Sequence, residues 1–251
     1  MLARGVRRKF CTFVGGAISP LLANLYMRRF VLGWKTLGHE QRFQAKIVNY
    51  ADDFVICCRG RAKEAMHAMR EMMRKLKLTV NEEKTHLCRL PEETFDFLGY
   101  TFGRCYSREG YRYIGQRPSK QKVQSLCRRI SQWTSIRWHW LEAEEQVGRL
   151  NRVIQGWANY FSQGPVNAPY RKVNLHARNR LRHWLLAKHD QKGLGYTIYS
   201  DDHLHEVLGL TRLHVRPELF RVRTHESLSE SRMRENRTSG LMRGRRGNGA
   251  R

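Results

Sequence analysis

The sequence predicts an α+β fold in which a mixed half with antiparallel strands precedes an all-helical half. Residues 46–58 place two runs of β-branched and aromatic residues around a short polar centre, the pattern of a β-hairpin. After Pro118 the apolar residues recur at helical spacing instead. The chain has 251 residues, of which 41% are hydrophobic, so it can bury a sizeable core and is not disordered throughout.

The first long helix is expected at Ser19, because serine followed by proline, Pro20, is a typical start of a helix. Its apolar residues continue to about Leu32, where we expect the helix to end. Gly33 and Gly38 should flank the loop that follows.

The hairpin is expected to pair residues 47–50 with residues 54–57, with Ala51, Asp52 and Asp53 at its tip. An amphipathic helix over about 61–77 follows, and its methionines are best explained as a packing stripe against the sheet. Residues 78–80 should form a short strand. The sequence therefore predicts that this half is a sheet covered by helices.

Residues 94–102 alternate aromatic and polar side chains, which predicts one strand bent at Gly99 and paired with an arm around 111–114. The second half should be helical and end in a disordered basic tail. Its helices are expected from Ser119, over about 142–163 and over about 169–188, and the tail over 221–251.

The charge balance points to a polyanionic partner. Forty-seven Lys and Arg face 22 Asp and Glu, for a net charge of +25 carried by both halves. Such an excess repels itself in a compact state, and nucleic acid would relieve the repulsion. The alternative is a highly charged surface that is merely solvated.

Neither a membrane span nor an isolated basic amphipathic helix is visible, so no membrane partner is expected. The six cysteines lack C-x-x-C pairing and suit a reducing, cytoplasmic location.

Asp52 and Asp53 are the first candidates for chemistry. Adjacent carboxylates repel each other unless a cation neutralises them. Magnesium prefers oxygen ligands, and metal-assisted phosphoryl transfer needs carboxylates on rigid elements. The alternative is an ordinary Asp-Asp turn that binds no metal.

The tetrapeptide Tyr50-Ala51-Asp52-Asp53 resembles the signature of reverse transcriptases, and its surroundings extend the match. The chain resembles the group II intron-encoded reverse transcriptase/maturases of bacterial retroelements, with their motifs in family order. The matching blocks are 15–24 (GGAISPLLAN), 50–53 (YADD), 78–85 (LTVNEEKT), 95–100 (FDFLGY), and Leu150-Asn151 with 156–161 (GWANYF) in the maturase-specific region.

The resemblance implies an RNA-directed DNA polymerase, a nucleotidyltransferase with a palm and a helical thumb. Asp52 and Asp53 would be catalytic ligands of Mg²⁺, with Mn²⁺ as an alternative, and Lys84 would meet the leaving pyrophosphate. Contacts to the nucleotide or primer would come from Gly15, Gly16, Ser19, Pro20, Tyr50, Phe97, Leu98, Gly99 and Tyr100.

The partners that the resemblance implies are intron RNA and an RNA template with its DNA primer. In the helical half, Asn151, Asn159 and Tyr160 are candidates for RNA contacts, whereas Trp157 and Phe161 are best explained by packing. Basic residues on polar helix faces are the candidates for phosphate contacts. They are Lys120, Lys122, Arg128, Arg129, Arg152, Arg171, Lys172, Arg178, Arg180 and Arg182.

The sequence departs from the family near its start. The family has an earlier palm strand with another catalytic aspartate, whereas the first aspartate here is Asp52, and Phe13-Val14 replaces the usual Pro-Gln. We therefore expect an N-terminally truncated member. Its parts would be an atypical segment 1–14, a partial palm 15–117, a thumb and maturase-like region 118–220, and the tail 221–251.

Three functions remain open. The first is a polymerase/maturase fragment that is inactive alone and is completed by a missing N-terminal half or a homodimer. The second is an RNA-binding splicing cofactor without polymerase activity. The third is an unrelated basic nucleic-acid-binding module. Burial of Asp52 and Asp53, or their placement inside a helix, would exclude the polymerase relation.

Overall fold

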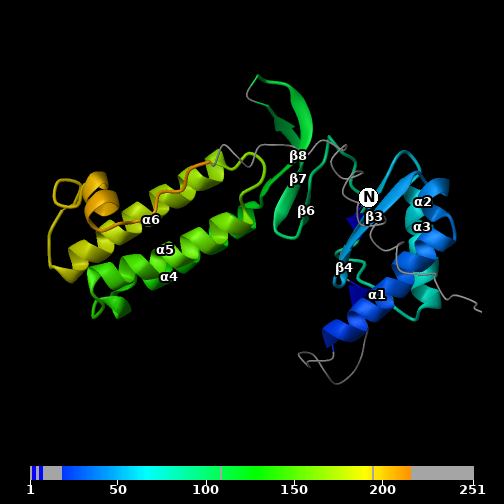
Figure 1. The fold of residues 1–251 in the computed structure, drawn as a ribbon, viewed down its shortest axis with the longest axis horizontal. Coiled ribbons are helices and arrows are strands. Elements are labelled where there is room, and N and C mark those ends of the chain that lie inside the picture. Colours follow the sequence, from blue (N-terminus) through cyan, green and yellow to red (C-terminus); the bar gives the residue numbers. More distant parts are fainter. Residues whose placement is uncertain (1, 4–5, 8–18, 108, 194, 216–251) are drawn as a thin grey trace, which may run out of the picture. The chain divides into compact units, whose positions relative to one another are not determined.

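The fold was determined as a computed structural model that describes residues 2–3, 6–7, 19–107, 109–193 and 195–215 (Figure 1). The chain divides into two compact units, with the boundary between Ser119 and Lys120. The first unit mixes helices with antiparallel strands and the second is helical, which confirms the predicted α+β class. The expected segment 1–14 lies largely, and the expected tail 221–251 entirely, outside the described residues.

The described residues of the first unit form three helices and three small sheets. The sheet that carries the hairpin has the order β1-β4-β3, a second pairs β2 with β5, and the third has the order β6-β7-β8. The elements are β1 (Leu2–Ala3), β2 (Val6–Arg7), α1 (Ser19–Thr36), α2 (His39–Arg42), β3 (Ala45–Tyr50), β4 (Asp53–Cys58), α3 (Ala62–Lys75), β5 (Thr79–Val80), β6 (Phe95–Phe97), β7 (Tyr100–Tyr106) and β8 (Arg112–Pro118).

Helices α1 and α3 pack on one face of the β3–β4 hairpin and form the core of this unit. Phe30 and Trp34 of α1 meet Met69 and Met73 of α3 in a cluster that also contains Phe54 of β4. All five side chains are buried. The methionines of α3 thus form the predicted packing stripe.

Helix α1 is longer than expected, because it runs through Gly33 and ends at Thr36. A Cβ at Gly33 would lie 3.1 Å from Cε of Met72 on α3. This glycine therefore allows close helix packing rather than ending the helix.

Residues 95–106 form two strands and not the single bent strand that the sequence predicted. Phe97 pairs with Tyr100, and the residues between them, Leu98 and Gly99, both have positive φ angles of 51° and 83°. This tight turn makes β6 and β7 a hairpin. Strand β8 then pairs with β7 along its whole length, close to the arm expected around 111–114.

The second unit is built on three long helices that share one core. Valine, leucine, isoleucine and tryptophan side chains of all three helices meet there, among them Ile130, Leu150 and Trp184. The helical elements are α4 (Lys120–Trp133), the turn η1 (Ile136–Trp138), α5 (Ala143–Tyr160), α6 (Asn167–Lys188) and the turn η2 (His203–Val207). Among the described residues, no helix is long and apolar enough to cross a membrane.

Candidate active site and nucleic-acid interface

The acidic pair lies at the end of the β3–β4 hairpin, as the sequence predicted. The strands are paired from Ala45 with Cys58 up to Tyr50 with Asp53, so the connecting turn contains only Ala51 and Asp52. Ala51 has a φ of 52°, a left-handed conformation that costs a non-glycine residue about 1–2 kcal/mol. Asp52 is exposed and Asp53 is half-buried. Neither carboxylate is buried in the core or placed in a helix.

Burial on both faces of β4 holds the hairpin tip in place. Phe54 and Ile56 point into the core formed with α1 and α3. Val55 points to the opposite face and packs against Phe97 of β6. The run Phe54-Val55-Ile56 is therefore apolar without alternation because both sides of this strand are covered.

On the face of the hairpin that carries Asp53, the β3 side is open to solvent, whereas the β4 side is covered at Val55. Tyr50 and Asp53 are paired in register, as are Val48 and Val55, so these four side chains share a face. Tyr50 is 65% exposed and Val48 is 54% exposed. An aromatic ring next to a carboxylate is suited to stacking on a base or sugar.

The two carboxylates at the hairpin tip are the type of ligand that Mg²⁺ prefers, because this ion binds mainly to oxygen atoms. Strand β1 lies on the other side of β4, where Ala3 pairs with Phe54, and no aspartate precedes Asp52 in the sequence. Within the described residues, no group of three or more His, Cys, Asp or Glu side chains could hold a metal ion. Of the residues that the structure describes, Asp52 and Asp53 are thus the two carboxylates at the hairpin tip.

Lys84 lies exposed in a turn after β5. Its backbone N–H donates to the carbonyl oxygen of Asn81 at 3.2 Å and to Oδ1 of the same residue at 3.3 Å. An ion pair of 2.6 Å between Arg70 and Glu82 ties this turn to α3. The local bonds fix the backbone of Lys84 and leave its ammonium group to solvent.

The side chains of the residues expected to hold the primer are mostly packed inside the first unit. Phe97 is 6% exposed and Tyr100 is 9% exposed, and Leu98 packs on the Val55–Phe97 cluster. Gly99 supplies the second left-handed residue of the turn. Of the other expected nucleotide contacts, Ser19 and Pro20 begin α1, and Gly15 and Gly16 lie outside the described residues.

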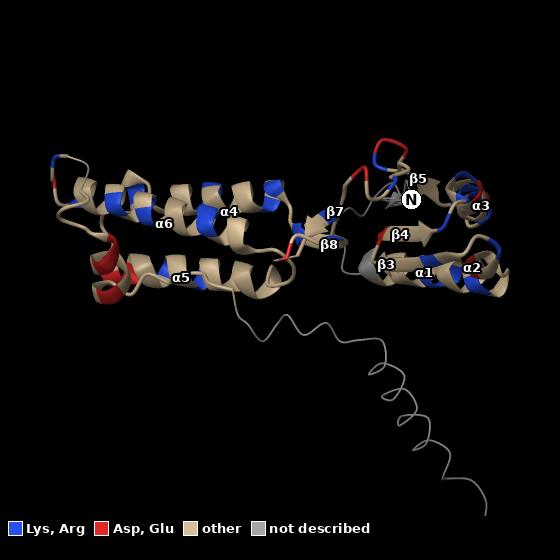
Figure 2. Ribbon diagram, turned by 90° about the horizontal axis from the view of Figure 1, so that it is seen from above, with Lys and Arg blue, Asp and Glu red and all other residues tan. Residues whose placement is uncertain are grey.

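In the second unit, most of the expected RNA-contacting side chains are exposed. Tyr160 is 54% exposed, and Arg129 lies over the ring of Trp133, 5.4 Å from its centroid. Basic residues recur along α4 and α6, whereas acidic residues gather around η2 (Figure 2). The exposed basic side chains are Lys120, Lys122, Arg128, Arg129, Arg152, Arg171 and Lys172.

The structure corrects the expectation for Arg182, which is 1% exposed. Its guanidinium donates to the Tyr199 carbonyl at 2.8 Å and to Asp201 at 2.6 Å. Arg178 also pairs with Asp201. Burial alone would raise the pKa of Asp201, but the hydrogen bond from Arg182 and the charges of Arg178 and Arg182 lower it overall. These side chains join α6 to the segment after it, so they are poor candidates for phosphate contacts.

Arg180 is also used within the unit. It donates to Oγ1 of Thr134 at 3.0 Å and to the carbonyl oxygens of Ser131 and Thr134 at 3.3 and 2.9 Å. Arg180 thereby supplies donors to one of the last carbonyls of α4, that of Ser131, and to the carbonyl of Thr134 just after the helix. This is a cap of one helix by another rather than an open RNA contact.

A feature that the sequence did not predict is an extended strap, residues 209–213, held by side-chain amides. Asn151 of α5 donates to the Gly209 carbonyl and accepts from the Thr211 N–H, both at 2.8 Å. Asn174 of α6 bonds the carbonyl and N–H of Leu213 at 2.8 and 2.9 Å. Asn151 therefore has a structural role in addition to the RNA contact that the sequence predicts. Asparagine inside a helix is unfavourable unless its side chain has a partner. The asparagines within α5 and α6 were therefore the sequence feature that could have indicated a segment bound to these helices.

Comparison with known protein families decides the identity of both units. Residues 4–102 match the family described as Reverse transcriptase (RNA-dependent DNA polymerase), and residues 123–200 match the group II intron, maturase-specific domain. Together the matches cover more than two thirds of the chain. The chain belongs to the group II intron reverse transcriptase/maturase family. No curated protein matches it.

The two family matches separate the candidate residues of this reverse transcriptase/maturase into two groups. The hairpin with Asp52 and Asp53, Lys84 and the β6–β7 turn fall in the reverse transcriptase match. Arg128, Arg129 and most of the other exposed basic residues fall in the maturase-specific match. The strap lies after both matches, which is why no family motif pointed to it.

Proposed function

We propose that this chain binds group II intron RNA through its helical unit and that it does not polymerise DNA by itself. The observation that carries the proposal is the row of exposed basic residues on α4 and α6, which coincides with the match to the maturase-specific domain. Cations on rigid helices suit the phosphates of structured RNA, which is recognised largely by shape and backbone contacts. The net charge of +25 adds a long-range attraction.

The test of RNA binding is its salt dependence. The purified chain should bind a transcribed group II intron RNA with an affinity that falls steeply as salt rises, because each phosphate contact releases counterions. Replacing Arg128 and Arg129 by alanine should weaken binding and reduce the magnitude of the log–log salt slope by about 1 per lost contact. The double variant Gln121→Ala, Gln124→Ala on the same helix is the control. A salt-independent affinity would contradict the proposal.

The polymerase site supports the second part of the proposal. Asp52 and Asp53 would hold Mg²⁺, or Mn²⁺, which supplies charge neutralisation for phosphoryl transfer. Tyr50 would pack under the nucleotide or primer end, and Lys84 would meet the departing pyrophosphate. A family member uses a further aspartate on an earlier palm strand, and β1 offers none next to β4. Two carboxylates on one hairpin are too few to position two metal ions.

The competing function is Mg²⁺-dependent primer extension, which the exposed carboxylates at the hairpin tip favour. We expect no extension by the purified chain on an RNA template with a DNA primer. Addition of a separate polypeptide that carries the earlier palm strand and its aspartate should restore activity, and Asp52→Asn should abolish the restored activity. Robust extension by the chain alone, lost in Asp52→Asn, would establish polymerase activity instead.

RNA affinity should be nearly the same in Asp52→Asn, because that residue lies away from α4 and α6 in the sequence and in another unit.

A further inference from the structure

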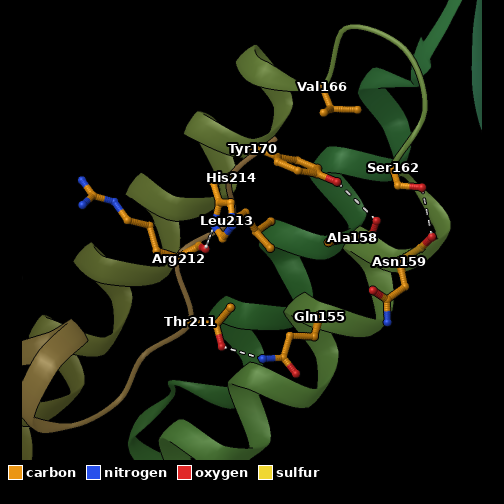
Figure 3. A pocket seen from close by; sticks show the side chains of 10 residues that line it. All are labelled: Gln155, Ala158, Asn159, Ser162, Val166, Tyr170, Thr211, Arg212, Leu213 and His214. Atoms are coloured by element: carbon orange, nitrogen blue, oxygen red, sulfur yellow. Dashed lines mark hydrogen bonds between the residues drawn. The ribbon is translucent and has the colours of Figure 1, made fainter. Parts of the chain in front are cut away.

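The helical unit contains a pocket whose lining includes none of the exposed basic residues of α4 and α6. It lies where the end of α5, the start of α6 and residues 211–214 meet, and its volume is about 400 Å³ (Figure 3). This is within the usual range of small-molecule sites. The side chains that matter for its chemistry are Gln155, Asn159, Ser162, Tyr170 and Leu213.

The walls of the pocket are fixed before any ligand arrives. The strap forms one wall and is held by Asn151 and Asn174, each through two hydrogen bonds to its backbone. Tyr170 forms another wall, is buried, and donates from its hydroxyl to the Phe161 carbonyl at 3.0 Å. A preformed cavity loses little conformational freedom on binding.

The side chains of α5 and α6 that offer hydrogen bonds to the pocket are neutral. Gln155 donates from Nε2 to Oγ1 of Thr211 at 2.9 Å, and its Oε1 can still accept. Asn159 is exposed, and among the described residues no hydrogen bond involves its amide group. Ala158, Val166 and Leu213 add apolar surface, and no acidic residue lines the cavity. Amide groups that both donate and accept match the edge of a nucleobase.

One arginine, Arg212, lines the cavity, and another, Arg152, lies on the same helix as Gln155 and Asn159. Arg152 is exposed one turn before Gln155 on α5, and therefore on the face that also bears Gln155 and Asn159. The side chain of Arg212 points away from the other pocket residues (Figure 3). A ligand with a neutral planar part and an attached phosphate suits this arrangement.

We propose that this pocket receives one unpaired, unstacked nucleobase of the intron RNA, with Asn159 bonding the base edge and Arg152 or Arg212 contacting the adjacent phosphate. The proposal rests on RNA binding by the helical unit and adds a site that reads a single splayed base. Sequence-specific RNA recognition commonly uses such unstacked bases. Stacked duplex bases cannot enter, so the pocket selects bulges and loops.

The test compares RNA hairpins that differ by one nucleotide. Four hairpins, each with one bulged A, C, G or U, are measured by fluorescence anisotropy against the same hairpin without a bulge, using the full chain. At least one bulged hairpin should bind about ten-fold more tightly, the effect of one good base contact. Asn159→Leu should abolish this preference, and Gln124→Leu on α4 should retain it. Circular dichroism checks that both variants are folded.

A second measurement locates the base. A bulged 4-thiouridine should crosslink on irradiation to peptides within 155–170 or 211–214. Crosslinks confined to other segments, or equal affinity for bulged and paired hairpins with a normal salt dependence, would overturn the pocket proposal and leave RNA binding intact. Failure to bind any of the RNAs would overturn both proposals.

Discussion

Two kinds of charged side chain are distinguished by what surrounds them. Arg152 is exposed on α5, whereas Arg182 is buried and bonded to Tyr199 and Asp201. Both are arginines in the maturase-specific match, and sequence alone could not separate them. A polar helix face can point to solvent or to a neighbouring segment, and only the fold decides which.

This difference predicts opposite effects of two equivalent substitutions. Arg182→Ala should lower the free energy of unfolding by roughly 2–3 kcal/mol, because it removes a buried side chain and its bonds to Tyr199 and Asp201. Arg152→Ala should change it by less than about 0.5 kcal/mol and weaken RNA binding instead. Urea denaturation and RNA titration of both variants make the comparison. Similar stabilities of the two variants would contradict the structural role of Arg182.

At the scale of single elements, the β3–β4 hairpin separates residues that pack behind the acidic tip from residues that face solvent beside it. Phe97 packs on Val55 behind the tip, and Tyr50 is exposed beside Asp53. The family motifs include both residues, so motif membership does not reveal which role each side chain has.

Substitution of these two aromatic residues should therefore have distinct results. Phe97→Ala should cost about 3–5 kcal/mol of stability, because it leaves a cavity in a packed cluster. Tyr50→Ala should leave stability nearly unchanged and weaken binding of a primer–template duplex. Thermal unfolding and duplex titration test the pair. A stable Phe97→Ala chain would mean that the β6–β7 hairpin is not needed to support β4.

The seam between α4 and α6 should respond to pH. Nε2 of His176 lies 2.9 Å from the Cys127 carbonyl oxygen and from Oγ of Ser131. Burial lowers the pKa of His176 below its ordinary value of 6.5, and the charge of Arg180 lowers it further, against the raising effect of the bond to Cys127. A base with a depressed folded pKa favours the unfolded chain once it protonates.

The free energy of unfolding should therefore keep its full contribution from neutral His176 above pH 6.5. It should decrease as the pH falls below that value. His176→Gln keeps an N–H donor but cannot titrate, so its stability should fall less over the same range. Denaturant midpoints of both proteins from pH 7.5 to about 5.5 give the answer. Parallel curves would exclude His176 as a source of the pH dependence.

Much of the element order was predictable because local patterns and tertiary packing agree. The β3–β4 hairpin, the methionine stripe of α3 and the three helices of the second unit follow from hydrophobic periodicity. Two of the deviations occurred at glycines. Gly33 lies inside α1 because Met72 needs its space, and Gly99 shares a tight turn with Leu98. A glycine signals unusual backbone or close packing, and the sequence does not say which.

The candidate site was predictable only where it coincides with a family motif. Asp52 and Asp53 were placed at a hairpin tip before the structure was known, and they lie there. The strap at 209–213 and the pocket beside it depend on hydrogen bonds between Asn151 and residues about 60 positions away. No local pattern encodes such a pairing.

For the whole molecule, the net charge of +25 should make salt act in two opposite directions. Raising NaCl from about 0.05 to about 0.3 M shortens the Debye length and weakens repulsion between like charges. The melting temperature of the free chain should therefore rise, while its affinity for intron RNA should fall. Thermal scans and RNA titrations in the same buffers test both signs. A melting temperature that falls with salt would show that attractive ion pairs outweigh the repulsion.

The tip of the β3–β4 hairpin offers a use in protein engineering. Positions 51–53 are supported from behind by a strand covered on both sides, and Asp52 itself is exposed. A library randomised at these three positions would be small enough to screen in full, and most of its members should still fold. Selection from it could yield tips with altered metal preference on an otherwise unchanged scaffold.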